Sequence, residues 1–254
     1  MSIKTALLDG VFTVEIARPE KKNALTMAMY GELTAAFVAA RDNPAVRAVL
    51  ITGQPGIFTS GNDLEDFMTA PPRDDSSPVF VFMRALLDCD KPVIAAVTGA
   101  AIGIGTTLLL HCDFVYISDE ARLAMPFASL GLVPEFASSL IVPRLMGHAR
   151  AAEKLLLGDP FTASEAVECG IANAVLPASE VVNHARRVAL RFNSLPPGAV
   201  RDTKRLMRAG SDAQVRQTLQ TEGAVFGERL RSPEAQEAFQ AFFQKRKPDF
   251  SRFS

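Results

Sequence analysis

The sequence has almost no net charge, few cysteines and no repetitive or low-complexity stretch. Its 254 residues carry 27 Lys and Arg against 28 Asp and Glu, a net charge of −1. Because nucleic-acid binders usually carry a clear positive excess, this balance argues against a nucleic-acid partner. With 48% apolar and 22% charged residues, the composition is that of a globular chain long enough for a full hydrophobic core.

The three cysteines, Cys89, Cys112 and Cys169, have no close spacing, so they suggest neither a zinc cluster nor a disulfide framework. We therefore assign no metal and expect a reducing, cytoplasmic setting. Residues 1–9 lack the basic start and apolar core of a secretory signal, and residues 252–254 are not a peroxisomal address.

One uncharged stretch, residues 92–110, is long enough to span a bilayer. Pro92 opens it, and three glycines and three threonines interrupt it. We interpret residues 93–97 as a buried strand, 98–102 as a turn and 103–110 as the start of a helix, and we expect no membrane partner.

Strands and helices alternate in the first half of the sequence. Asp9-Gly10 lies between two β-rich runs, which predicts a hairpin. Thr26 is placed to cap a helix that runs to about Asn43. Residues 71–78, rich in Pro, Asp and Ser, predict an exposed mobile loop. Together with a predicted helix at 80–87 and strands at 48–52, 93–97 and 114–117, the alternation predicts an α/β chain with mostly parallel strand pairing.

From Ser138 onward the pattern becomes almost wholly helical. Pro196-Pro197-Gly198 marks a joint between a core at residues 1–195 and a helical segment at residues 196–254. The last predicted helix should pack on its own core or on a neighbouring subunit through one apolar side, which carries Ala235, Phe239, Phe242 and Phe243.

Two loops rich in small residues follow predicted strands. In Phe58-Thr59-Ser60-Gly61-Asn62-Asp63-Leu64, small residues let a backbone approach a ligand, and Asp63 can cap the next helical turn. Taken alone, this segment is better explained as an ordinary loop with an N-cap.

The second loop, residues 99–107, opens a helix. Gly103 and Gly105 lack the third glycine of a dinucleotide fingerprint, and no lysine follows Gly105 as in a Walker loop. Free N–H groups at a helix start lined by glycine suit a developing oxyanion better than a pyrophosphate.

Glu135 is the only acid between Glu120 and Glu153, and its neighbours are apolar. If this segment is buried, loss of hydration should raise the carboxyl pKa towards neutrality, which suits a general base. An exposed glutamate after a proline turn is an equally good interpretation.

No serine or cysteine sits in a nucleophile elbow and the three histidines are scattered, so a hydrolytic triad is not supported.

Taken together and in order, these stretches resemble the crotonase (enoyl-CoA hydratase/isomerase) superfamily over nearly the whole chain. The resemblance implies a spiral of ββα units with a helical C-terminal part for trimerisation. It also implies an acyl-CoA thioester substrate, a homotrimer or dimer of trimers, and no separate cofactor, because CoA is part of the substrate. The matching segments are Arg18-Pro19-x-x-x-Asn23-Ala24-Leu25, Ser60 to Leu64, Gly99-x-x-x-Gly103-x-Gly105, Cys112-Asp113, Phe161 to Ala172 and Lys245 to Phe250.

The resemblance also implies site residues. The backbone N–H groups of Asn62 and Ile104 match the two oxyanion-hole donors. The CoA phosphates would be met by Lys21, Lys22 and Lys245. The CoA and acyl pocket would be lined by Ser60, Gly61, Asn62, Asp63, Leu64, Ala24, Gly103, Phe127 and Phe136.

Departures from the family pattern bear on the reaction. Hydratases of the family carry two water-activating glutamates, where this chain has Thr107 and Phe127. Family Δ3,Δ2-enoyl-CoA isomerases carry one glutamate in a Leu-Gly-Leu-x-x-Glu segment, which resembles residues 130–135 here. The resemblance therefore favours an isomerase with Glu135 as the proton shuttle. Phe136, in place of a small residue, should narrow or reshape the acyl pocket. The alternatives are a hydratase, a CoA-thioester hydrolase and a non-catalytic acyl-CoA-binding protein.

Overall fold

The structure is a computed structural model that describes residues 2–69, 71–72 and 75–253. The strands are β1 (Ile3–Leu8), β2 (Val11–Ile16), β3 (Ala48–Thr52), β4 (Gly56–Thr59), β5 (Val93–Val97), β6 (Gly99–Ile102), β7 (Phe114–Ser118), β8 (Arg122–Ala124), β9 (Phe161–Thr162) and β10 (Ala174–Leu176). The α-helices are α1 (Met27–Asp42), α2 (Leu64–Thr69), α3 (Pro78–Leu87), α4 (Ile104–Thr107), α5 (Ser138–Met146), α6 (His148–Ala152), α7 (Ala163–Glu168), α8 (Val181–Leu190), α9 (Pro197–Ala209), α10 (Asp212–Leu230) and α11 (Pro233–Phe243). Shorter 3₁₀ and π turns include η2 (Leu108–His111) and η3 (Ala128–Leu130).

The larger sheet has the strand order β1-β2-β3-β5-β7-β10. β1 and β2 form the predicted antiparallel hairpin, in which Asp9 and Gly10 adopt the positive φ angles of a tight turn, 51° and 74°. Every other pair in this sheet is parallel. The predicted α/β class with mostly parallel pairing is therefore confirmed.

A smaller sheet, β4-β6-β8-β9, lies beside the first. The chain sends one strand to each sheet in turn: β3 then β4, β5 then β6, β7 then β8. This repeated exchange produces the spiral that the resemblance implies. It also brings the residues that follow β4 next to those that follow β6, because these two strands are parallel neighbours.

Two expectations from the sequence are wrong here. Residues 98–102 were expected to form a turn, but residues 99–102 form β6. The chain after Ser138 was expected to be almost wholly helical, but it supplies β9 and β10. These strands have only two to four residues, and each has a single β-branched residue, so they are too short to show the alternating pattern by which a strand is recognised.

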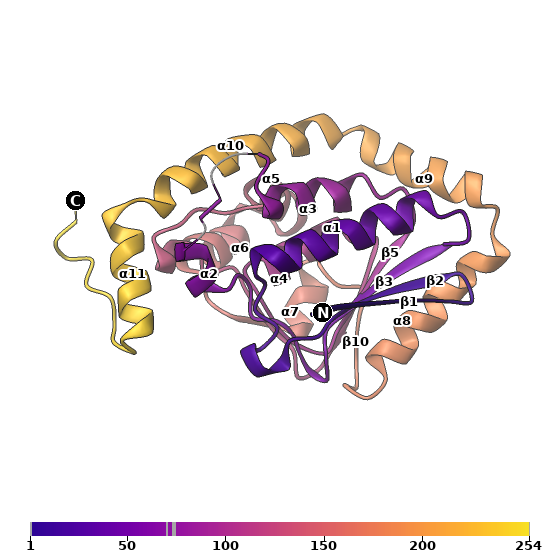
Figure 1. The fold of residues 1–254 in the computed structure, drawn as a ribbon, viewed down its shortest axis with the longest axis horizontal. Coiled ribbons are helices and arrows are strands. Elements are labelled where there is room, and N and C mark those ends of the chain that lie inside the picture. The colour runs from indigo at the N-terminus through magenta and orange to yellow at the C-terminus, as the bar shows by residue number, and fades with distance from the viewer. Residues whose placement is uncertain (1, 70, 73–74, 254) are drawn as a thin grey trace.

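Helices cover both faces of the larger sheet (Figure 1). α1 begins after Thr26, whose hydroxyl accepts the Met29 N–H as predicted, and its Leu33 and Phe37 are fully buried. The rings of Phe37 in α1 and Phe82 in α3 lie 6.0 Å apart, so the two helices pack together on one face. α8 covers the other face through Val181, Ala185, Val188 and Ala189.

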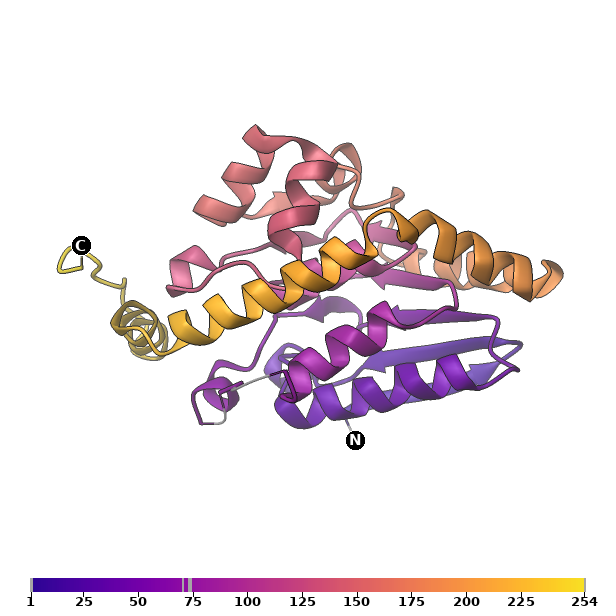
Figure 2. The same ribbon diagram turned by 90° about the horizontal axis from the view of Figure 1, so that it is seen from above.

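The C-terminal helices wrap around this core. Figure 2 shows α10 crossing over the earlier helices and α11 turned aside near the C-terminus. Ala235 and Phe239 of α11 are buried, as expected for its apolar side, but Phe242 and Phe243 are 59% and 47% exposed. Packing on the protein's own core is therefore confirmed for Ala235 and Phe239, and packing of Phe242 and Phe243 on a neighbouring subunit stays a prediction.

Within the described residues, no helix combines the length and apolar character needed to cross a bilayer. The uncharged stretch is divided among β5, β6, α4 and η2. In the predicted 71–78 loop, residues 73 and 74 lie outside the described part of the chain, and Pro72 is buried rather than exposed. Pro78 already begins α3.

We predict that Gly99→Ala strongly destabilises the protein. A Cβ at residue 99 would lie 1.9 Å from the carbonyl oxygen of Gly56, inside the β4–β6 pair. Overpacking against backbone should cost at least about 3 kcal/mol in the free energy of unfolding, measured in urea. Gly227→Ala in α10 is the matched control, because its Cβ meets nothing within 4 Å and alanine favours a helix by about 0.5–1 kcal/mol. Equal stability of the two variants would contradict this packing.

Candidate active site

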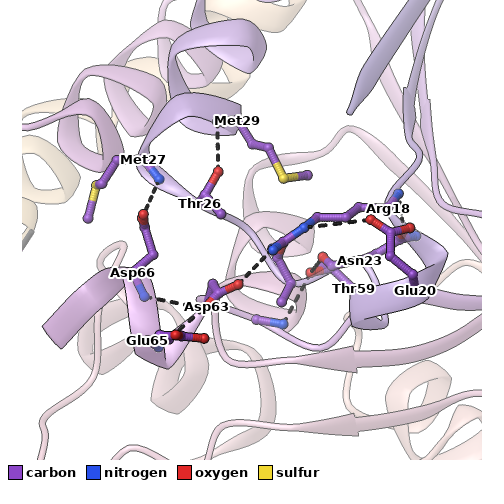
Figure 3. A network of polar contacts seen from close by, with 12 residues as sticks. Arg18, Glu20, Asn23, Thr26, Met27, Met29, Thr59, Asp63, Glu65 and Asp66 are labelled. Atoms are coloured by element: carbon purple, nitrogen blue, oxygen red, sulfur yellow. Dashed lines mark hydrogen bonds and ion pairs between the residues drawn. The ribbon is translucent and has the colours of Figure 1, made fainter. Parts of the chain in front are cut away.

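A polar network before α1 holds the first loop in place (Figure 3). Asn23 has a left-handed backbone, φ 55°, which asparagine tolerates better than most residues. Its side-chain amide donates to the carbonyl oxygens of Ile16 at 3.0 Å and Phe58 at 3.1 Å. The Thr59 hydroxyl donates to the Asn23 carbonyl at 2.6 Å. Asn23 therefore joins the end of β2 to β4.

Arg18 and Asp63 form the second part of this network (Figure 3). Arg18 Nη1 donates to Asp63 Oδ2 at 2.7 Å and to the Ala24 carbonyl at 2.9 Å. Asp63 Oδ1 accepts the N–H groups of Glu65 and Asp66, which confirms its predicted capping of α2. Burial raises the pKa of Asp63, but the Arg18 contact and these N–H bonds outweigh it and lower the pKa overall.

The backbone of Asn62 is oriented by a short parallel bridge to Leu25. The Leu25 N–H donates to the Gly61 carbonyl at 2.8 Å, and the Leu25 carbonyl accepts the Asp63 N–H at 2.9 Å. Because this bridge uses the residues on either side of Asn62, the N–H of Asn62 itself faces away from Leu25. The hydroxyl of Tyr30 donates to Asn62 Oδ1 and fixes the side chain.

The two loops predicted to act together touch through their backbones. Gly61 has φ +92°, and a Cβ there would lie 2.8 Å from the carbonyl oxygen of Ile102. Gly103 follows with φ +56°, and Ile104 is the first residue of α4. The N–H of a first helical residue has no partner within its helix. The parallel β4–β6 pair thus brings Asn62 and Ile104 into one corner of the molecule.

Glu135 is buried, at 5% exposure, so the exposed alternative is excluded. Its backbone is tightly held: the Ser138 hydroxyl donates to the Glu135 carbonyl at 2.6 Å. Phe136 and Ala137 then both adopt left-handed backbones at φ 58°, an uncommon conformation for residues with a side chain. His111 Nε2 donates to the Phe136 carbonyl at 2.7 Å.

The surroundings of Glu135 disfavour its charged form. Burial, with the nearby negative charge of Glu222 as a smaller cause, raises the pKa of Glu135 to about 8. Burial lowers the pKa of His111 to about 4, so its ring is neutral and provides no counter-charge. Oε1 of Glu135 is one of few buried side-chain oxygens, among the described residues, without a hydrogen-bond partner. An unsatisfied carboxyl oxygen with a near-neutral pKa is the environment expected of a proton-transfer group.

A cavity of about 660 Å³ joins Glu135 to both loops. Most of its wall is apolar or aromatic, as is typical of pockets for organic ligands. The lining residues include Ala24, Ser60, Gly61, Asn62, Asp63, Leu64, Gly103, Phe127 and Glu135, with Lys21 and Lys22 among them. The structure therefore brings together most of the residues selected from the sequence.

Three selected residues do not line this cavity. Ile104 follows the lining residue Gly103 but is itself fully buried and is not part of the cavity wall. Phe136 was expected to shape the acyl pocket, but its ring is buried in the core, stacked on His111 at 4.0 Å and edge-on to Phe82. The left-handed backbone directs Glu135 and Phe136 to different surroundings. Lys245 is exposed near the C-terminus and does not line the cavity.

Three supporting residues escaped the sequence analysis: Tyr30, His111 and Glu222. Tyr30 orients Asn62, His111 holds the Phe136 carbonyl, and Glu222 accepts hydrogen bonds from the turn after Glu135. The signals available were weak, since a tyrosine on a helix, an isolated histidine and a glutamate in a polar helix are all common. Thr107, at one of the hydratase positions, is fully buried in α4.

A family model described as enoyl-CoA hydratase/isomerase matches residues 7–252. The chain belongs to the enoyl-CoA hydratase/isomerase family. The solved structure of Pseudomonas aeruginosa OdaA is 52% identical, with a TM-score of 0.93 over 95% of this chain and 98% of that chain. These matches confirm the crotonase-like fold and the expected family.

Relatives named isomerase and relatives named hydratase are both similar to this chain. Human enoyl-CoA delta isomerase 2 is 37% identical over 207 residues, which is 79% of this chain and 52% of the human protein. This chain thus spans about half the length of that relative. A probable enoyl-CoA hydratase of Bacillus subtilis is 30% identical over 233 residues, 90% of each chain.

We predict that Asp63→Asn lowers the free energy of unfolding by about 1–2 kcal/mol at pH 7, because the ion pair with Arg18 is lost and the mostly buried guanidinium keeps only a neutral acceptor. The folded-state pKa of Asp63 is depressed, so its contribution is present above the unfolded pKa of about 4 and is lost as pH falls through the folded value. The difference between wild type and variant should therefore shrink at acid pH in urea titrations. The exposed Asp159→Asn is the control, and an equal effect there would contradict the Arg18–Asp63 pairing.

Proposed function

We propose that the protein moves the double bond of a 3-enoyl-CoA thioester to the 2-position. The observation that carries the proposal is how the carboxylates along the cavity differ in exposure, in pairing and in pKa. Glu20 and Glu65 are exposed and Asp63 is paired with Arg18, whereas Glu135 alone is buried with a raised pKa. A single poised carboxyl suits a reaction in which one proton leaves and returns.

The chemical difficulty is the removal of a weakly acidic C2 proton next to the thioester. As that proton leaves, negative charge builds on the thioester oxygen. The backbone N–H groups of Asn62 and Ile104 would donate to this oxygen, and one such donor typically contributes a few kcal/mol to the barrier. Their meeting at the Gly61–Ile102 contact supports this role.

Glu135 would act as the base and then as the acid. Its carboxylate takes the proton from C2, which leaves a dienolate on the substrate, and the neutral carboxyl returns the proton to C4. The double bond then lies between C2 and C3, in conjugation with the carbonyl. Because one proton is taken up and one is given back, the enzyme ends in its starting state and no water is consumed.

Addition of water would require further groups. In family hydratases two glutamates activate the water, and this chain has Thr107 and Phe127 at those positions. Neither side chain takes a proton from water at neutral pH. Exposed Lys21 and Lys22 line the same cavity and would meet the CoA phosphates.

We predict that Glu135→Gln lowers kcat for isomerisation by about 10²–10⁴-fold, the usual contribution of a general base, while thioester binding stays near normal. In the wild type, kcat/KM should rise with pH to a plateau above about 8, because the base must be ionised. Stopped-flow absorbance of the conjugated product measures both, and calorimetry measures binding.

The exposed Glu168→Gln in α7 is the control for this experiment and should keep the wild-type rate and pH profile. Near-normal turnover by Glu135→Gln would remove Glu135 from the mechanism.

We predict that 3-enoyl-CoA is converted much faster than 2-enoyl-CoA is hydrated when each is supplied alone. In deuterated water, C2 exchange should accompany turnover because the carboxyl proton can exchange with solvent. Comparable hydration of 2-enoyl-CoA would favour a hydratase, release of free CoA would favour a hydrolase, and binding without exchange would indicate a non-catalytic acyl-CoA-binding protein.

A further inference from the structure

A second buried glutamate lies behind the candidate base. Glu222, in the middle of α10, is only 7% exposed. Its Oε2 accepts the Ala137 N–H at 2.5 Å, and its Oε1 accepts the Ser139 N–H at 2.8 Å. Both carboxylate oxygens are therefore bound to the turn that follows Glu135, although the two segments are far apart in the sequence.

These bonds hold an unusual piece of backbone. Phe136 and Ala137 are consecutive left-handed residues, a conformation that persists only when the surroundings enforce it. Ser138 and Ser139 begin α5 immediately afterwards, so Glu222 also serves as the acceptor for the free N–H groups at that helix start. Because Glu135 precedes this turn directly, the anchor sets the direction of its carboxyl.

Glu222 is better placed than Glu135 to carry a charge. Its side chain also lines a surface groove of about 450 Å³ with Gln217 and Thr221, where water can reach it. Burial raises the pKa of Glu222 above its usual value, and the hydrogen bonds from Ser139 and Ala137 reduce this rise without cancelling it. Glu135 has no such donors on Oε1.

The other titratable groups around Glu135 are neutral near pH 7. Tyr30 approaches from α1, and burial, followed by the charges of Glu135 and Asp66, raises its pKa well above the usual value. His111 approaches from η2 and is uncharged. Among the described residues, Glu222 on α10 is therefore the charged group that acts on the Glu135 carboxyl.

We propose that Glu222 is a positioning residue for Glu135, which anchors the turn at residues 136–139 by two hydrogen bonds and keeps a fixed negative charge beside the Glu135 carboxyl. The catalytic meaning of this inference rests on the proposed function, since it is Glu135 that would move the proton. The anchor also gives α10 a direct connection to the cavity.

The test separates charge from anchoring. Glu222→Gln keeps the size and one of the two acceptor oxygens but removes the charge, whereas Glu222→Met removes the charge and both acceptors. Infrared spectra recorded across pH follow the carbonyl stretch of the protonated Glu135 carboxyl, which is assigned by comparison with Glu135→Gln. Glu228→Gln is the matched control, because it removes a carboxylate from the exposed side of the same helix.

We expect the midpoint for Glu135 to fall by about one pH unit in Glu222→Gln, because a like charge is removed, and to stay unchanged in Glu228→Gln. The acid limb of kcat/KM should move to lower pH by the same amount. Glu222→Met should show the same shift and, in addition, at least a tenfold lower kcat at the plateau, because the turn is no longer anchored.

Thermal unfolding identifies which variants fold. Either Glu222→Gln or Glu222→Met is sufficient to measure the titration midpoint of Glu135. A wild-type midpoint in a folded Glu222→Gln or Glu222→Met overturns the proposal. A shifted midpoint in a chain that isomerises no 3-enoyl-CoA supports the positioning role and contradicts the proposed function. If neither neutral variant folds, Glu222→Asp tests the anchor, because it keeps the charge on a side chain that is one methylene shorter: a lower kcat at the plateau supports the proposal, and a wild-type kcat overturns it.

Discussion

The site depends on keeping one carboxyl group out of water. An ionised carboxylate loses much of its hydration on burial, so the group resists ionisation unless the protein supplies donors. Here the Ser138 hydroxyl donates to the backbone carbonyl of Glu135, and the Ser139 N–H donates to Glu222. Oε1 of Glu135 has no hydrogen-bond donor. Burial, followed by the negative charge of Glu222, therefore raises the pKa of Glu135 to about 8.

A second constraint is the close approach of two backbones. Gly61 lies against the carbonyl of Ile102, and a Cβ at Gly105 would lie 2.6 Å from the Thr59 side chain. Side chains at these positions would separate the smaller sheet from the loops that follow it. The residues that permit the contact therefore also bring the backbones of Asn62 and Ile104 close to each other.

The sequence predicts what is determined locally. The hairpin at Asp9-Gly10, the Thr26 cap and the Asp63 cap each depend on residues a few positions apart, and all three are correct. The small sheet was missed because β6 and β9 are short and take their pairing from neighbours rather than from their own composition. The smaller sheet forms from strands that lie far apart in the sequence, so no short stretch of sequence predicts it.

The same distinction applies within the site. Glu135 stands out in the sequence because it is the only acid in a long apolar stretch, and its burial follows from those neighbours. The placement of Phe136 was wrong because two left-handed residues turn the chain at that point, and neither is a glycine that would reveal the turn. Tyr30, His111 and Glu222 reach the site from three separate elements, so only the folded chain brings them together.

The number of buried carboxyl groups that face the substrate bears on the choice of reaction. Hydration needs a group that takes a proton from water and a group that gives one to the substrate, whereas double-bond migration needs one group to do both in succession. Glu222 accepts the N–H groups of Ala137 and Ser139 and lines a separate groove, so it can influence Glu135 but does not line the cavity. Glu135 is therefore the one buried carboxyl among the described residues that line the cavity, which supports the proposed return of a proton rather than the addition of water.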